Sequence, residues 1–165
     1  MNKILLIALL MSMSLGSLLA QQRNNVSEHV RVIISNPSAS YLMVSQQFVR
    51  LDLAAYPIVP NQPYQPMVEQ DITYDILSVG SNKRLVAQLV DGQMPPHTIL
   101  EVRANPPQGA SSHGFQPLST TQQTIVSNIN NMQGTNLEMR FRLRAELGAP
   151  ILTETERTVR FTIMD

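Results

Sequence analysis

The stretch that decides the fold lies at the end of the chain, where residues 137–146 read LEMRFRLRAE and residues 158–163 read TVRFTI. In both stretches apolar and polar residues alternate at every position. A period of two is typical of a β-strand with one face buried and the other exposed to water. The end of the chain therefore predicts two half-buried strands within an antiparallel β architecture.

A short Gly-Ala-Pro segment at residues 148–150 separates the two stretches, so we expect them to pair as an antiparallel hairpin. The register with Arg142 opposite Glu156 gives the most pairs of opposite charge, and each pair contributes about 0.2–1 kcal/mol. The other charge pairs of this register are Arg144 with Glu154 and Glu138 with Arg160. The apolar face should be buried as one group, made up of Met139, Phe141, Val159, Phe161 and Ile163.

Further stretches also predict strands, because they alternate or form short apolar runs bounded by Gly, Pro or Asn. They are residues 29–34, 41–54, 72–76, 85–89 and 99–104. We expect 72–76 and 85–89 to form a hairpin with Ile76 opposite Leu85. Residues 118–131 leave two interpretations open, a short strand around 124–129 or a single helical turn.

These elements amount to seven or eight short strands with no amphipathic helix. Regular turn signals between short strands are typical of an all-β fold, here a single antiparallel β-sandwich with Greek-key connections. We expect this domain to span residues 21–165.

The N-terminus has the pattern of a secretory signal peptide at residues 1–20. Lys3 supplies a positive charge, residues 4–10 are uninterrupted apolar residues, and the small residue Ala20 precedes the polar Gln21. A retained transmembrane anchor is the alternative, but the apolar stretch is shorter than the ~20 residues that a span requires. We therefore predict cleavage after Ala20, no membrane span afterwards, and export to the periplasm, the cell surface or the medium.

Composition excludes several classes of function. The chain has no cysteine, which excludes disulfides, thiol catalysis and thiolate metal sites. Removing Lys3 from the twelve Lys and Arg leaves eleven against twelve Asp and Glu. A charge so close to zero gives no electrostatic footprint for nucleic acid.

The sequence shows no catalytic or cofactor-binding motif. The three histidines, His29, His97 and His113, are far apart in the sequence, and neither His97 nor His113 has a carboxylate within three residues. The run Ser111–Ser112–His113 lies in a Gly- and Pro-rich stretch without a positioned acid, so we interpret it as a loop and not as part of a serine triad. We predict a protein that is not an enzyme and holds no metal or cofactor.

Two features are candidates for contact with a ligand or partner. Arg140, Arg142 and Arg144 share one face of a predicted strand, where guanidinium groups would suit an acidic glycan. The alternative is a charge ladder with neighbouring and opposing glutamates. Tyr56 and Tyr64 lie in a Pro-rich segment, where exposed tyrosines can contact partners or sugars; the alternative is that they cap the sandwich.

The segment TYDILSVGSNKRLVAQLVDGQMPPHTILEVRANPPQGASSHG, with the later PLSTT and the terminal TVRFTI, resembles a family of small secreted bacterial Ig-like domains related to fimbrial subunits. The match runs from Thr73 to Ile163 and consists of turns and alternation. The resemblance implies an Ig-like fold and carries no catalytic residue across.

Together these features predict an exported non-catalytic structural or adhesive protein, such as a cell-surface or fimbria-like subunit. The alternative is a module of the periplasm or cell surface that binds a carbohydrate or an acidic polymer. The expected partners are a protein, a second copy of the chain, or an acidic glycan.

Overall fold

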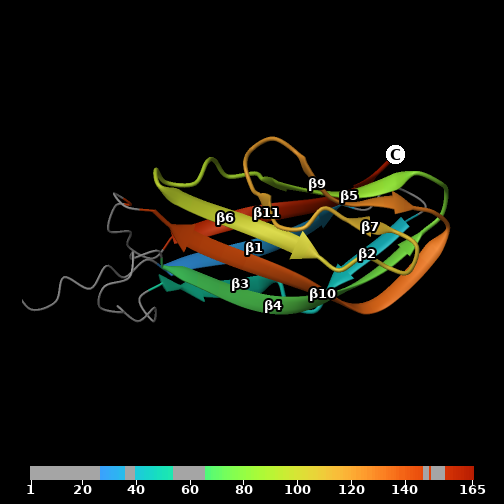
Figure 1. Cartoon of the computed structure of the whole chain (residues 1–165), viewed down its shortest axis with the longest axis horizontal. Helices are drawn as coiled ribbons and strands as arrows, with labels where there is room; N and C mark the ends of the chain where they lie inside the picture. The colour runs from blue at the N-terminus through green and yellow to red at the C-terminus, as the bar shows by residue number, and fades with distance from the viewer. Residues whose placement is uncertain (1–26, 36–39, 54–65, 147–148, 150–154) are drawn as a thin grey trace, which may run out of the picture.

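The structure is a computed structural model that describes residues 27–35, 40–53, 66–146, 149 and 155–165. These residues form two β-sheets that pack face to face (Figure 1). The part of the chain that is described contains strands and turns but no α-helix, so the all-β prediction is confirmed.

The six-stranded sheet has the order β3-β1-β11-β5-β9-β7 and the five-stranded sheet has the order β2-β4-β10-β6-β8. In the six-stranded sheet the strands are β3 (Phe48–Asp52), β1 (Ser27–Ser35), β11 (Thr155–Met164), β5 (Lys83–Leu89), β9 (Gln123–Ile129) and β7 (Ser111–Ser112). In the five-stranded sheet they are β2 (Ser40–Val44), β4 (Met67–Ser78), β10 (Met132–Ala145), β6 (Thr98–Ala104) and β8 (Gln116–Pro117).

The number of strands exceeds the seven or eight that we expected. The described ranges contain eleven, of which β7 and β8 are only two residues long. The ambiguous segment 118–131 forms strand β9 and not a helical turn.

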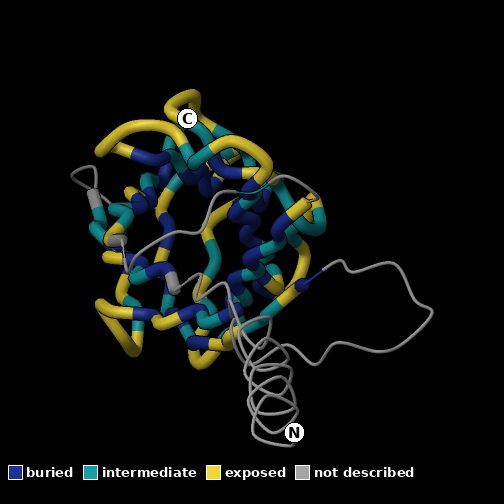
Figure 2. Tube along the Cα trace, turned by 90° about the vertical axis from the view of Figure 1, so that its left-hand side faces the viewer, coloured by how far each residue is buried: buried dark blue, intermediate teal, exposed yellow. Residues whose placement is uncertain are grey.

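The core lies between the sheets, where alternate residues of both meet (Figure 2). The two alternating stretches at the end of the chain form β10 and β11, and their apolar faces are buried as predicted. Their exposed fractions are 0% for Met139, Phe141, Val159 and Phe161 and 1% for Ile163. Burial of this kind contributes about 1.5–3 kcal/mol for each large apolar side chain.

The predicted hairpin between these two stretches is wrong. Strand β10 pairs with β4 and β6 in the five-stranded sheet, whereas β11 pairs with β5 and, in parallel, with β1 in the other sheet. Arg142 therefore lies opposite Glu69 and Glu101, and not opposite Glu156. Alternation decides which side of a strand is buried but leaves its partner open, and two strands facing each other across the core satisfy the same pattern.

The second predicted hairpin is also wrong, for the same reason. Ile76 lies on β4, whereas Leu85 lies on β5 of the opposite sheet, where its partner in the β5–β11 ladder is Ile163. The turn between β4 and β5 does exist, with Gly80 and Asn82 at φ of 111° and 57°. It takes the chain from one sheet to the other, so both apolar faces are buried in the shared core and not side by side in one sheet.

The N-terminal segment 1–20 lies outside the described residues. Among the residues that the structure does describe, no helix has the length and apolar character needed to cross a membrane.

Candidate functional site

The outer face of the five-stranded sheet carries the densest group of polar side chains that we find in the structure. It forms because the core takes every second residue of β4, β10 and β6, which leaves the alternate residues pointing outward. On β4 the outward residues are, in order, Glu69, Asp71, Thr73, Asp75 and Leu77. Along this strand the face carries two carboxylates first, then the hydroxyl of Thr73 and a third carboxylate, and it becomes apolar at Leu77.

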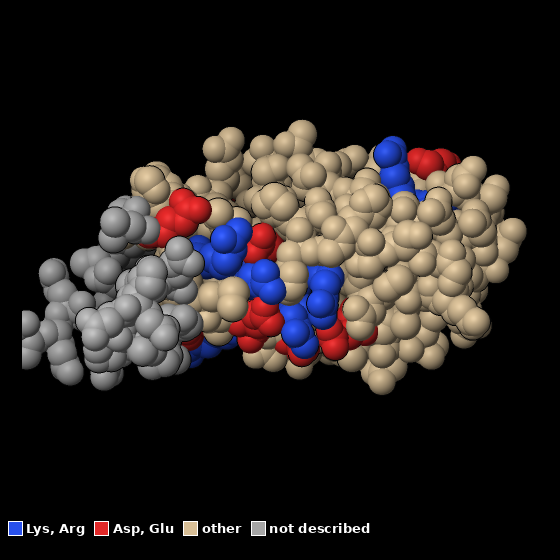
Figure 3. Space-filling view, viewed as in Figure 1, with Lys and Arg blue, Asp and Glu red and all other residues tan. Residues whose placement is uncertain are grey.

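The charged part is a network of four arginines and four carboxylates on β4, β10 and β6, which we call the ionic network. Its members are Arg103, Arg140, Arg142, Arg144, Glu69, Asp71, Glu101 and Glu138. Figure 3 shows blue and red side chains interleaved at this place, while most of the remaining surface in that view is uncharged. Equal numbers of opposite charges cancel, so the network presents no net positive patch.

Arg140 has the most extensive set of contacts in the ionic network. Its guanidinium binds Asp71 through two hydrogen bonds, one of them from Nη2 to Oδ2 at 2.8 Å, and Nη1 reaches Oε2 of Glu69 at 3.2 Å. The hydrogen bond to Asp71 is the main cause that raises the pKa of Arg140. A bidentate pair of this kind has a defined geometry that single surface ion pairs lack.

The other two arginines of β10 also have carboxylate partners. Arg142 donates from Nε to Oε1 of Glu69 at 2.6 Å, and Arg144 donates to both oxygens of Glu101 at 2.9 and 3.1 Å. The hydrogen bond to Glu101 raises the pKa of Arg144. Glu101 is itself buried, with 8% exposure, and these arginines supply the partners that a buried carboxylate needs.

An aromatic ring covers part of the ionic network. The guanidinium carbon of Arg142 lies 3.4 Å from the centroid of the Phe115 ring, and that of Arg103 lies 5.2 Å from it. A cation over a ring face contributes about 0.5–1 kcal/mol at exposed sites. Phe115 directly precedes β8, the edge strand that pairs with β6 in this sheet.

The structure thus brings together Arg140, Arg142 and Arg144, and the charge-ladder interpretation describes their surroundings. The opposing carboxylates differ from those expected, because Glu156 lies on β11 in the other sheet and Glu154 lies outside the described residues. The neighbouring Glu138 does form an ion pair with Arg140, at 3.5 Å. The true partners had a signal in the sequence, since Glu69, Asp71 and Glu101 also occupy outward positions of alternating stretches. Tyr56 and Tyr64 lie outside the described residues.

The histidines do not converge on a metal site. His113 Nε2 lies 2.9 Å from Oγ of Ser127 on β9, so its partner is not Ser111 or Ser112. His97 Nδ1 lies 4.0 Å from Glu146. No group of three or more possible metal ligands occurs within the described ranges.

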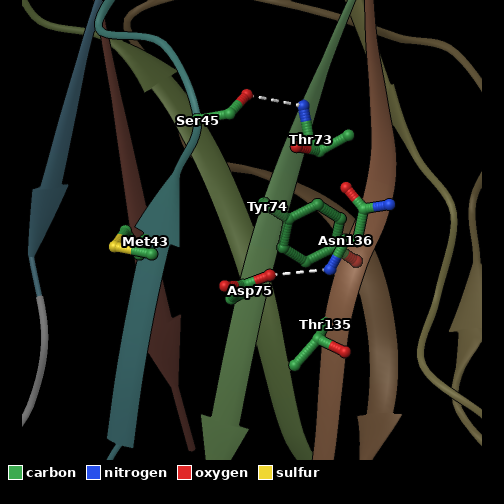
Figure 4. A pocket seen from close by; sticks show the side chains of 7 residues that line it. All are labelled: Met43, Ser45, Thr73, Tyr74, Asp75, Thr135 and Asn136. Carbon is green, nitrogen blue, oxygen red and sulfur yellow. Dashed lines mark hydrogen bonds between the residues drawn. The ribbon is translucent and has the colours of Figure 1, made fainter.

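A polar pocket of about 240 Å³ lies beside the ionic network, which we call the bulge pocket (Figure 4). Its lining comes from β2 and the residue after it, from β4, and from β10: Met43, Ser45, Thr73, Tyr74, Asp75, Thr135 and Asn136. The register of β10 against β4 shifts between Gly134 and Leu137, which is a β-bulge. Bulges re-aim side chains, and this one places Thr135 and Asn136 at the pocket.

Two sets of hydrogen bonds hold the bulge pocket in shape. The backbone N–H of Asn136 donates to Oδ1 of Asp75 at 2.6 Å, and Asn136 has a φ of 54°. On the other side, Ser45 Oγ accepts from the N–H of Thr73 at 2.9 Å, while Ser45 N–H donates to the Thr73 carbonyl at 2.8 Å. Asn tolerates the left-handed conformation better than most residues, which suits it to this position.

Sequence reasoning did not find the bulge pocket. Its residues come from three segments that become neighbours only in the folded sheet. The one local signal is that the alternation of residues 137–146 does not extend back through Gly134, Thr135 and Asn136.

No protein-family model matches the chain, and a search of curated proteins finds no significant match. The resemblance to secreted Ig-like domains therefore stays a prediction that rests on the turn and alternation motifs between Thr73 and Ile163.

Proposed function

We propose that this protein is an exported, non-catalytic structural or adhesive protein, a cell-surface or fimbria-like subunit, and that its sandwich is Ig-like with Greek-key connections. The observation that carries the proposal is an exposed, uncharged sheet edge. Strand β2 ends the five-stranded sheet and has the sequence SYLMV, without a charge or a proline. Natural proteins usually protect such an edge, because its free N–H and C=O groups can pair with another strand.

The side chains at this edge are apolar and exposed. Tyr41 and Met43 on β2 are 47% and 46% exposed, and Leu77, opposite Tyr41 on β4, is 45% exposed. The edge strand β3 of the other sheet also exposes an apolar side chain, Phe48, but it differs from β2 because it carries the ion pair Arg50–Asp52. Strand β2 is thus an edge strand that exposes apolar side chains and has no charge of its own.

A groove beside β2 gives an added strand room to bind. It has a volume of about 410 Å³ and is lined by one segment of β1, by β2 and by Gln47. Its apolar lining residues include Val32, Ile34, Leu42 and Val44. We propose that the occupant is a second copy of this chain, since two uncharged β2 strands can pair without bringing like charges together.

The oligomeric state tests this proposal. Sedimentation velocity over a concentration series should show reversible association of the purified exported protein. Tyr41→Lys should remain monomeric, because a charge at the edge blocks pairing, whereas Val90→Lys at another exposed apolar position should associate like the wild type. A wild type that is monomeric at every concentration contradicts self-association.

Cell fractionation tests the export part. The protein should be found in the periplasm, on the surface or in sheared filaments, and it should lack residues 1–20. Recovery with an intact N-terminus from the cytoplasm alone would contradict export.

A second candidate function is binding of an acidic glycan or polymer through Arg140, Arg142 and Arg144, with Tyr56 and Tyr64 as further contacts. It is supported by the three arginine side chains on one face, which are 27%, 25% and 39% exposed. The ligand would have to displace carboxylates that already bind these arginines. A glycan array read at low and moderate salt tests it, because such binding should weaken as salt screens the charges.

A further inference from the structure

We propose that the bulge pocket is a binding site for one neutral sugar residue or a similar polyhydroxylated ligand. The site differs from the arginine face, and it does not depend on self-association through β2. Four observations support it: the unused polar groups of the pocket, its charge, its apolar contacts and its preformed shape.

The polar groups that face the pocket match the needs of sugar hydroxyls, which both donate and accept hydrogen bonds. Within the part of the chain that is described, the hydroxyls of Thr73 and Thr135, Oδ2 of Asp75 and the side-chain amide of Asn136 have no hydrogen-bond partner. The Ser45 hydroxyl oxygen accepts from Thr73, which leaves its O–H free to donate. Together they offer a carboxylate acceptor, an amide with both functions, and hydroxyls.

The charge of the pocket selects a ligand that is not an anion. Asp75 is the only charged residue in the lining, and it forms no ion pair with any described residue. The closest arginine on β10, Arg140, is bound to Asp71 and Glu69. An acidic sugar would meet an uncompensated carboxylate here, so this site has the opposite preference to the arginine face.

Apolar surface completes the lining. Met43 lies at the rim, on the β2 side, and supplies the accessible apolar surface with an exposure of 46%, whereas Tyr74 is only 1% exposed (Figure 4). Sugar rings carry C–H groups that pack on such surface, while a few placed polar groups fix their orientation.

The size and shape limit the ligand to a single residue. A volume of about 240 Å³ is below the ~300–1,000 Å³ of pockets that hold drug-sized ligands. The hydrogen bonds from Asn136 to Asp75 and between Ser45 and Thr73 hold these groups in place before a ligand binds. A preformed site avoids part of the entropy cost of binding.

The test is an NMR titration of the exported protein with four neutral probes, the methyl glycosides of glucose, galactose, mannose and N-acetylglucosamine, and with glucuronate as an acidic probe. At least one neutral probe should give saturable shifts at the amides of Thr73, Asp75 and Asn136, with a dissociation constant near the millimolar range. Glucuronate should bind more weakly than methyl glucoside.

Two variants remove polar groups without disturbing the backbone. Asn136→Gly keeps both the positive φ and the N–H that donates to Asp75, and Thr135→Val keeps the shape of an exposed side chain. Each should weaken binding about five- to tenfold, the value of one hydrogen bond. The matched controls are Asn128→Gly, which also has a positive φ, and Thr162→Val on the other sheet; neither should change binding.

The proposal is overturned if no neutral probe gives saturable shifts, if the shifts lie only at the arginine face, or if Asn136→Gly and Thr135→Val bind as the wild type does. Tighter binding of glucuronate would also overturn it and would favour the acidic-glycan function instead. Repeating the titration with Tyr41→Lys tests sugar binding separately from self-association. That variant removes self-association and leaves every lining residue of the pocket in place.

Discussion

The rings of Phe141 and Phe161 lie 6.2 Å apart with an angle of 78° between their planes, and they come from strands of opposite sheets. Both side chains are fully buried. This edge-to-face pair joins the two sheets across the core, so a substitution of either ring should be strongly damaging.

Phe161→Ala should lower the free energy of unfolding by about 3–5 kcal/mol, because it removes a buried aromatic ring and leaves a cavity. Denaturant melts measure this directly. Phe48→Ala is the control, since Phe48 is 60% exposed and its loss should cost less than about 0.5 kcal/mol. The double variant with Phe141→Ala should be less destabilised than the sum of the single effects, by about 0.5–1.5 kcal/mol.

Arg142→Ala should lower the free energy of unfolding by at most about 1 kcal/mol, as is usual for ion pairs at a protein surface. In this variant Arg140 still contacts Glu69, and Arg144 still contacts Glu101, so each carboxylate keeps a cationic partner. Melts at low and high salt should show a smaller effect at high salt, where surface charges are screened. A loss greater than that of Phe161→Ala would mean that the inner and outer faces of β10 are assigned wrongly.

Asn136→Ala should destabilise the protein by about 1–2 kcal/mol, whereas Asn136→Gly should be close to neutral. The reason is the φ of 54°, which places a Cβ atom in an unfavourable left-handed conformation that glycine adopts freely. Thermal unfolding of the two variants side by side measures the difference. Equal stabilities would show that the bulge does not hold residue 136 in this conformation.

Tyr74 should contribute a pH dependence at alkaline pH. Burial raises its pKa above the ordinary value, so the phenol stays protonated in the folded protein, where it donates to the Asn105 carbonyl at 2.6 Å. The unfolded chain releases this proton at a pKa of about 10. The stabilisation that comes from this difference in pKa is therefore fully present below pH 10, and it is lost as the pH rises above that value.

Tyr74→Phe is the matched variant for this effect. At neutral pH its free energy of unfolding should be about 1 kcal/mol lower than that of the wild type, because the hydrogen bond is missing. At alkaline pH it should lack the part of the destabilisation that comes from this phenol. Urea melts at neutral pH and above pH 10 measure both changes. An identical alkaline loss in the variant and the wild type would show that Tyr74 is not its source.

The sequence alone determined which residues face the core. The alternation of residues 137–146 and 158–163 is a local property, because successive side chains of a strand point to opposite sides wherever the strand lies. Met139, Phe141, Val159, Phe161 and Ile163 were therefore predicted to be buried, and they are. The all-β class followed in the same way from the spacing of strands and turns.

The partners of each strand were decided only by the tertiary structure. Arg142 has an acidic residue opposite it in the predicted hairpin, but Glu69 and Glu101 offer the same charge from segments far away in the sequence. A pattern of charges cannot choose between equal partners. The choice depends on which pairing lets all the apolar faces close over one core, and this placed β10 and β11 in opposite sheets.

The bulge pocket likewise could not be predicted from the sequence. Ser45, Asp75 and Asn136 belong to three segments, and none of them shows a motif on its own. They meet because β2 and β10 both pair with β4, and because the bulge turns Asn136 toward Asp75. Local periodicity thus determined the faces of the strands, whereas the closing of the two sheets over a common core determined their neighbours and the site between them.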